Sequence, residues 1–247
     1  MIQHDEQWYK DWFDNHFYGT VYQHRSQEDA DRAVELLLRV VPLERGDAVL
    51  DVCCGAGRHL KALVNAGLHA SGIDLSANLL RLAAEELPAS VVLHQGDMRR
   101  PYPAAPYKCI TNFFTSFGYF DDDADNQEVL HRFHEALEPK GWLFFDFLNA
   151  ANVRELLVSE DERELEGMRV RQERWIDERF VNKRITITDE EANHHTFTEQ
   201  VRLYDLEDFS RMFAKAKLRI REIFGDYDGS AYHDNSPRLI ITARSML

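Results

Sequence analysis

The apolar positions along the chain follow two spacings, which together predict alternating strands and helices. Consecutive apolar residues at Ala48–Val52 are typical of a parallel strand that is buried on both faces. Glu28–Val41 instead carries its apolar residues on one helical face and stops before Pro42. The same two patterns predict strands at 68–74, 91–94, 108–113 and 142–147 and helices at 58–66, 76–87 and 125–137. This alternation predicts an α/β fold with a doubly wound, mostly parallel sheet and helices on both faces.

The two ends of this pattern differ from its middle. The aromatic-rich segment 5–22 has the spacing of a helix. The stretches 168–176, 180–188 and 195–204 alternate polar and apolar residues, which predicts a small antiparallel sheet inserted beside the binding crevice. A helix at 206–216 and strands at 219–224 and 238–242 bring the main sheet to seven strands. We therefore expect a helical segment at 1–42, a core at 43–149 and 205–247, and an antiparallel insertion at 150–204.

A loop of small residues joins the first strand to its helix. Gly55 and Gly57 allow backbone angles and close ligand approach that a side chain would prevent. The next strand ends on Asp74, where a carboxylate can accept hydrogen bonds from both hydroxyls of a ribose. Leu60 stands where a dinucleotide fingerprint has its third glycine, and Asp51 would repel a phosphate but attract an ammonium. An amino acid joined to adenosine therefore fits this loop better than NAD.

These residues resemble the first motif of the class I S-adenosylmethionine-dependent methyltransferases. The likeness continues through 95–98, with Asp97 after the third strand, and through 137–143, where Lys140 replaces the first glycine of the usual Pro-Gly-Gly turn. The stretches 112–120, 225–229 and 236–239 are similar to a small-molecule subgroup that includes glycine and amino-sugar N-methyltransferases. The resemblance implies a Rossmann-like fold, S-adenosylmethionine as methyl donor and S-adenosylhomocysteine as product.

The cofactor residues follow from this resemblance and from their positions at strand ends. Asp97 would meet the adenine amino group, and Arg25 would pair with the methionine carboxylate. Met98 and Tyr22 could instead serve only in packing. Arg25 could instead be an ordinary charged residue on the surface. The full predicted set is Tyr22, Arg25, Asp51, Cys53, Gly55, Gly57, Asp74, Leu75, Asp97, Met98, Asn112 and Phe113.

Methyl transfer from a sulfonium is an in-line displacement that depends mainly on alignment and exclusion of water. Aromatic faces attract cations, so tyrosines are suitable neighbours of the sulfonium. The catalytic candidates are Tyr18, Tyr119, Tyr227 and His233, each of which has a structural role as its alternative.

The composition restricts the partners. A formal net charge of −14 repels polyanions. We therefore expect no nucleic-acid partner and a neutral or cationic small-molecule acceptor. No apolar run approaches the roughly twenty residues that span a membrane, and residues 1–6 lack the features of a signal peptide, so we expect a cytoplasmic protein. The histidine pairs at 131 and 134 and at 194 and 195 lack further ligands, and no metal is predicted. The chain is compatible with a monomer or a homodimer.

The sequence thus predicts a methyltransferase that acts on nitrogen, oxygen or carbon of a small molecule. Two alternatives use the same pocket: a protein that binds S-adenosylmethionine or S-adenosylhomocysteine as a sensor or scaffold, and an enzyme with other chemistry on this cofactor. A third, an NAD-dependent oxidoreductase, is disfavoured by Leu60.

Overall fold

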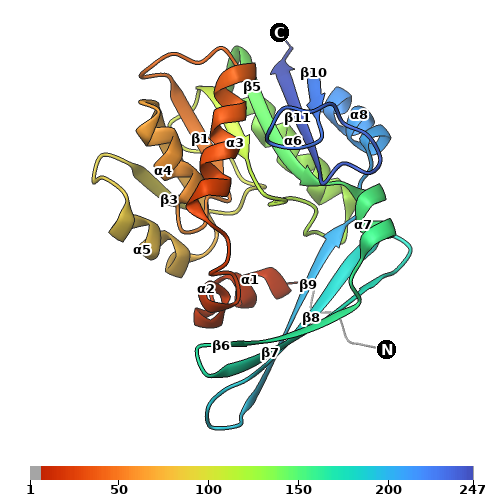
Figure 1. Ribbon diagram of the computed structural model, residues 1–247. Coiled ribbons are helices and arrows are strands. Elements are labelled where there is room, and N and C mark those ends of the chain that lie inside the picture. Colours follow the sequence, from red (N-terminus) through yellow and green to blue (C-terminus); the bar gives the residue numbers. More distant parts are fainter. Residues whose placement is uncertain (1–6, 247) are drawn as a thin grey trace.

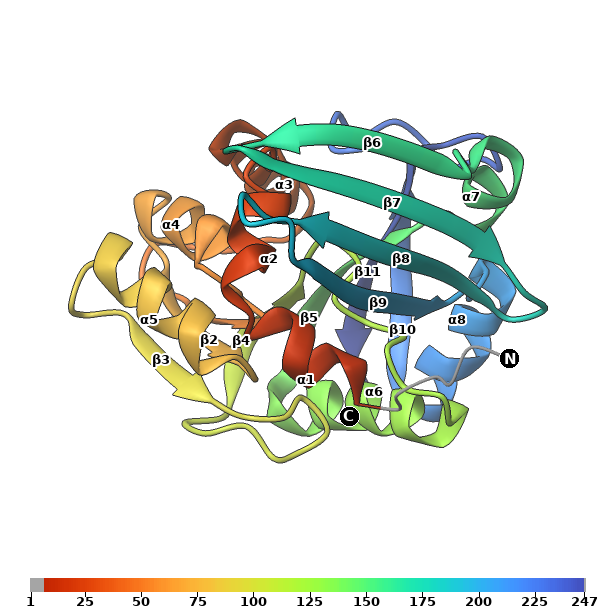
Figure 2. The same cartoon turned by 90° about the horizontal axis from the view of Figure 1, so that it is seen from below.

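The computed structural model describes residues 7–246 and contains two separate sheets (Figures 1 and 2). The central sheet has seven strands in the order β10-β11-β5-β4-β1-β2-β3. The strands are β1 Ala48–Val52, β2 His69–Asp74, β3 Val92–Gln95, β4 Tyr107–Asn112, β5 Leu137–Leu148, β10 Leu218–Phe224 and β11 Arg238–Ser245. Strands β1 to β5 pair in parallel, whereas β11 is antiparallel to β5 and to β10. The predicted mostly parallel sheet is confirmed.

Helices cover both faces of this sheet, as the alternating pattern predicted. Three helices pack on one face: α3 Gln27–Val40, α4 Arg58–Asn65 and α5 Ala77–Glu86. Two others pack on the opposite face: α6 Asp123–Ala136 and α8 Leu206–Lys215. Neighbouring side chains of β1 pack on opposite faces of the sheet. Val49 packs with α3 to α5, and Leu50 packs with α6 and α8. This double burial explains why the strand sequences are apolar throughout.

The antiparallel insertion lies within the predicted bounds 150–204 but has four strands where three were predicted. Its strands lie in the order β6-β7-β8-β9, and the three that were predicted correspond to β7 to β9. The bounds are β6 Glu160–Leu165, β7 Met168–Ile176, β8 Phe180–Thr188 and β9 His194–Arg202, with α7 Ala150–Leu156 before them. Strand β6 was not predicted, because five of its six residues are charged. Such a composition is typical of an edge strand but lacks the alternation of polar and apolar residues.

The aromatic segment forms two short helices instead of the single predicted one. They are α1 Trp8–Phe13 and α2 His16–Val21, and the predicted start at Asp5 lies outside the described residues. Asn15 separates them because its side chain accepts a hydrogen bond from the Phe17 amide and caps α2. Both helices lie between the central sheet and the antiparallel sheet (Figures 1 and 2). Trp12 packs on Phe197 of β9 with ring centroids 4.5 Å apart.

Candidate active site

Two adjoining cavities lie where the central strands end, the N-terminal helices pass and the antiparallel sheet begins. The larger has a volume of about 370 Å³ and the smaller about 80 Å³. The residues that line both are Phe13, Tyr18, Cys53, Gly55, Leu79, Ser116 and Tyr119. Because seven residues line both, the two cavities are adjacent.

The smaller cavity is lined by two carboxylates and by apolar side chains. Asp74, at the end of β2, accepts hydrogen bonds from the amides of Gly55 at 2.8 Å and Ser76 at 2.9 Å. Burial raises the pKa of Asp74 although these amide bonds oppose the shift. Predicted cofactor residues Leu75 and Met98 form part of the apolar wall. Acceptor oxygens beside apolar surface suit the ribose and base of a nucleoside.

Asp97 is the second carboxylate of this cavity. Partial burial would raise its pKa, but hydrogen bonds from Arg99 outweigh this effect and lower the pKa of Asp97. The Arg99 Nη2 atom lies 2.6 Å from an Asp97 oxygen, and its Nη1 lies 2.6 Å from Asp125. The guanidinium thus fixes the orientation of Asp97 at the cavity wall.

The two glycines of the loop have different roles. Gly55 lines both cavities and has a φ of +54°. Gly57, with a φ of +84°, precedes α4 and lies outside the lining, and a Cβ there would come within 2.9 Å of Leu87 Cδ1. Gly55 therefore allows close approach of a ligand, whereas Gly57 allows the loop to pack against α5.

Asp51 is buried immediately before the loop and is only 1% exposed. Its Oδ1 accepts a hydrogen bond from the Thr111 hydroxyl at 2.9 Å, whereas Oδ2 has no partner among the described residues. Burial raises the pKa of Asp51 to about 7, against the effect of the Thr111 bond. An unpartnered buried carboxylate oxygen two residues from cavity-lining Cys53 is consistent with a cationic ligand group nearby.

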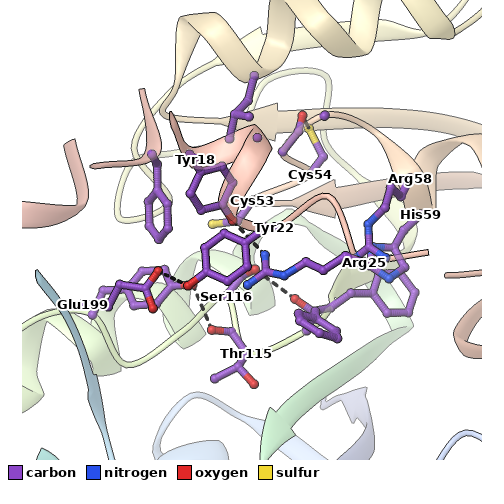
Figure 3. A pocket seen from close by; sticks show the side chains of 18 of the residues that line it. Tyr18, Tyr22, Arg25, Cys53, Cys54, Arg58, His59, Thr115, Ser116 and Glu199 are labelled. Carbon is purple, nitrogen blue, oxygen red and sulfur yellow. Dashed lines mark hydrogen bonds between the residues drawn. The ribbon is translucent and has the colours of Figure 1, made fainter. Parts of the chain in front are cut away.

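The larger cavity contains aromatic rings and cations, as Figure 3 shows. Arg25 donates to the Tyr18 hydroxyl at 2.8 Å and lies 3.7 Å from the centroid of the Tyr22 ring. Arg58 lines the same cavity, and Tyr119 donates its hydroxyl to the Thr115 carbonyl at 2.9 Å. Tyr18, Tyr22, Arg25 and Tyr119, all predicted from the sequence, are therefore brought together.

A buried ion pair closes the side of this cavity formed by the antiparallel sheet. Lys183 of β8 and Glu199 of β9 face each other in register, with Nζ 3.0 Å from Oε2. Glu199 also accepts hydrogen bonds from Trp12 Nε1 at 2.6 Å and from the Tyr22 hydroxyl (Figure 3). This ion pair was not predicted. Two predicted strands carry these opposite charges, which could have indicated an ion pair. Recognising the pair would have required the register of the two strands, which the sequence does not give.

Several predicted site residues lie outside the lining of both cavities. Asn112 donates from its side-chain amide to the carbonyls of Val52 and Ser116, and so braces the loop after β4. The Tyr227 hydroxyl is buried against Asp146 Oδ2 at 2.6 Å, and His233 is exposed on the loop before β11. Tyr227 and His233 therefore lie outside the lining of both cavities, and their catalytic roles stay predictions.

Phe113 does line the larger cavity, stacked on His59 with ring centroids 4.3 Å apart. His59 was not predicted as a site residue. Burial lowers the pKa of this histidine well below its usual value, so His59 is neutral and acts as a flat wall.

No group of three or more His, Cys, Asp or Glu side chains suitable for a metal occurs within residues 7–246. Over the same residues, no helix is both long and apolar enough to cross a membrane.

Comparison with known proteins agrees with this geometry. A methyltransferase domain family matches residues 49–141, which contain the glycine loop, Asp74 and Asp97. A dTDP-3-amino-3,6-dideoxy-alpha-D-glucopyranose N,N-dimethyltransferase from Streptomyces fradiae is 27% identical over 227 residues, which cover 85% of this chain and 84% of the relative. A related N,N-dimethyltransferase from Streptomyces venezuelae is 34% identical over 94 residues, 38% of this chain and 39% of the relative.

Solved structures share the fold over nearly the whole chain. The CcbJ methyltransferase from Streptomyces caelestis superposes with a TM-score of 0.81 at 18% identity and covers 99% of this chain and 100% of its own. An S-adenosylmethionine-dependent methyltransferase from Clostridium acetobutylicum gives a TM-score of 0.79 at 18% identity, with 94% and 97% covered.

Together these matches support a class I S-adenosylmethionine-dependent methyltransferase. The chain is similar to the amino-sugar N-methyltransferases. The expectations of family, fold, cofactor and enzyme class are thereby confirmed.

Proposed function

We propose that this enzyme methylates an amine nitrogen of an amino sugar. The observation that carries the proposal is the pair of adjoining cavities, with carboxylates in one and aromatic rings and cations in the other. The two N,N-dimethyltransferase relatives support nitrogen as the methylated atom and an amino sugar as the acceptor class. The net charge of −14 further supports a small acceptor over a nucleic acid, and we place the enzyme in the cytoplasm as part of the proposal.

The smaller cavity is suited to the adenosine part of the donor. Asp74 keeps lone pairs for the ribose hydroxyls beyond the two amide bonds it already accepts. We place the adenine amino group at Asp97, whose orientation Arg99 fixes, with Leu75 and Met98 packed against the ring.

The methionine part would then lie along the glycine loop. The unpartnered Oδ2 of Asp51 suits its ammonium, and the guanidinium of Arg25 suits its carboxylate. We propose that the segment 1–42 covers the cofactor, that 43–149 and 205–247 form the binding core, and that 150–204 covers the substrate. Side chains of the first and last of these segments, such as Tyr22 and Lys183, do line the larger cavity.

When bound, the donor would supply a sulfonium methyl group. An amine lone pair would attack the methyl carbon in line, forming the N–C bond as the C–S bond breaks and S-adenosylhomocysteine leaves, and the methylated ammonium would then release a proton. The protein's task is to align the amine and to exclude water. Tyr18 and Tyr119 line both cavities and so flank the passage between the donor and the acceptor. Burial raises the pKa of both phenols, so they stay protonated at neutral pH and position the reactants without acting as bases.

The test is turnover with S-adenosylmethionine and a panel of small molecules, followed through the formation of S-adenosylhomocysteine. We expect methylation of amino sugars and no methylation of the corresponding sugars that carry a hydroxyl in place of the amine. Binding of the donor without consumption by any amine would contradict the proposal and favour a sensor or scaffold. Methylation of the sugars that lack the amine would show that oxygen is the acceptor atom.

A further inference from the structure

Tyr22, Lys183 and Glu199 form a polar cluster that the placement of the donor leaves unused, and we call these three residues the acceptor cluster. All three line the larger cavity. The side chains of Lys183 and Glu199 are only 16% and 18% exposed. Tyr22 accepts a hydrogen bond from Lys183 and donates one to Glu199. The cluster thus joins the N-terminal segment to the antiparallel sheet at the cavity wall.

An ion pair in this position is costly for stability. Burying both charges loses their hydration, and two apolar residues of similar volume are often as stable or more stable. Other ion pairs on the same sheet, such as Arg171 with Glu160, have side chains about half exposed. The buried pair is therefore better explained by a role in binding than by a contribution to folding.

The hydrogen bonds within the cluster leave one donor and one acceptor toward a ligand. The Lys183 ammonium has three protons and uses two, on Tyr22 and Glu199. Glu199 Oε1 accepts from Trp12 and Tyr22, whereas Oε2 accepts, within residues 7–246, only from Lys183. A free N–H and a free carboxylate lone pair thus lie on atoms 3.0 Å apart.

We propose that the acceptor cluster binds a neutral hydroxyl group beside the amine of the acceptor. A hydroxyl both donates and accepts, so it satisfies Glu199 Oε2 and Lys183 Nζ together. Glu199 would repel a carboxylate in the same place, and Lys183 would repel an ammonium. Because the charges of Lys183 and Glu199 cancel, the cluster suits a neutral group. The inference rests on the proposed function and deepens it: the enzyme selects amino alcohols, including amino sugars, over amino acids and plain amines.

The experiment compares two ring amines that differ by one hydroxyl, aminocyclohexanol and cyclohexylamine. For the unchanged enzyme we expect kcat/KM to favour aminocyclohexanol by about 100-fold, because the analogue that lacks the hydroxyl loses hydrogen bonds to charged groups. Lys183→Met should remove most of this preference and leave the affinity for S-adenosylhomocysteine unchanged.

Arg184→Met is the matched control. Arg184 is the next residue on β8, pairs with Glu173 at 3.5 Å and lies outside the cavity lining, so the preference should persist. If Lys183→Met unfolds, Lys183→Met/Glu199→Gln removes both charges while keeping an oxygen for Trp12 and Tyr22. The same loss of preference is expected.

The outcomes separate this inference from the proposed function. If the unchanged enzyme binds the donor but methylates neither amine nor any amino sugar, the proposed function is wrong. If it methylates both amines with equal efficiency, or if the folded cluster variant keeps the preference, methyl transfer to amines stands and the role of the acceptor cluster is wrong.

Discussion

Asp51 combines deep burial with an unpartnered oxygen, and this makes the stability of the protein depend on pH. Burial raises its pKa from an ordinary value of 3.8 to about 7, so the folded protein holds a proton that the unfolded chain has released. Between these two values the unfolding free energy contributed by Asp51 falls as pH rises. We expect Asp51→Asn to make the unfolding free energy fall less steeply with pH over this range. Urea unfolding at several pH values measures this dependence. Identical slopes in the two proteins would contradict the burial of this carboxyl.

Asp74 allows a direct test of the ribose contact. We expect Asp74→Asn to weaken binding of S-adenosylhomocysteine by about 1 to 3 kcal/mol, because charge-assisted hydrogen bonds are lost. Glu85→Gln on α5 is a suitable control, since it removes an exposed carboxylate paired only with Arg81. Calorimetry that shows equal affinity for the two variants would place the ribose elsewhere.

Residues in local motifs were predictable, and residues brought together by strand pairing were not. Asp74, Gly55 and Asp97 follow strands whose order along the chain already indicates a common edge. Lys183 and Glu199 are sixteen positions apart, and only the register of β8 with β9 makes them neighbours. The hydrogen bond of the Tyr227 hydroxyl to Asp146 is another contact that the sequence does not reveal.

At the scale of elements, the hydrogen bond from Trp12 to Glu199 joins α1 to β9. We expect Trp12→Phe to lower the unfolding free energy by about 1.5 to 3 kcal/mol more than Trp8→Phe, since a hydrogen bond to a charged group is lost. Trp8 is the matched control because it is also buried in α1, and its Nε1 has no partner among the described residues. Chemical denaturation measures both variants. Equal losses would mean that the Glu199 contact does not hold α1 in place.

The predicted elements with regular patterns were confirmed, and the irregular ones were missed. Helix α5 illustrates the first case, since the Ser76 cap expected from the sequence accepts a hydrogen bond from the Leu79 amide at 3.0 Å. Strand β6 and helix α7 illustrate the second, because each is short and has little apolar periodicity. Their positions depend on pairing with β7 and on the connection from β5, which are tertiary features.

For the whole molecule, the net charge of −14 should influence capture of the donor. S-adenosylmethionine carries a net positive charge, whereas S-adenosylhomocysteine lacks the sulfonium and is neutral overall. We expect the association rate of the first to fall with rising ionic strength and that of the second to change little. Stopped-flow fluorescence of the N-terminal tryptophans would follow both. Equal salt dependence would show that local contacts, and not the overall field, govern association.

The general architecture followed from the sequence because strand and helix periods alternate along the core. The sequence also placed the antiparallel sheet beside the crevice, but it did not reveal the contacts between distant segments that fix the sheet there, such as Trp12 with Phe197. The acceptor side of the site was consequently the part that required the structure.

The central claim is that the two cavities together hold S-adenosylmethionine beside an acceptor amine. Isothermal calorimetry of the purified chain against S-adenosylmethionine, S-adenosylhomocysteine and NAD tests it most directly. We predict saturable micromolar binding of the first two and none of NAD. Binding of NAD alone, or of no ligand, would contradict the assignment of Asp51, Asp74 and Asp97 to the methyl donor.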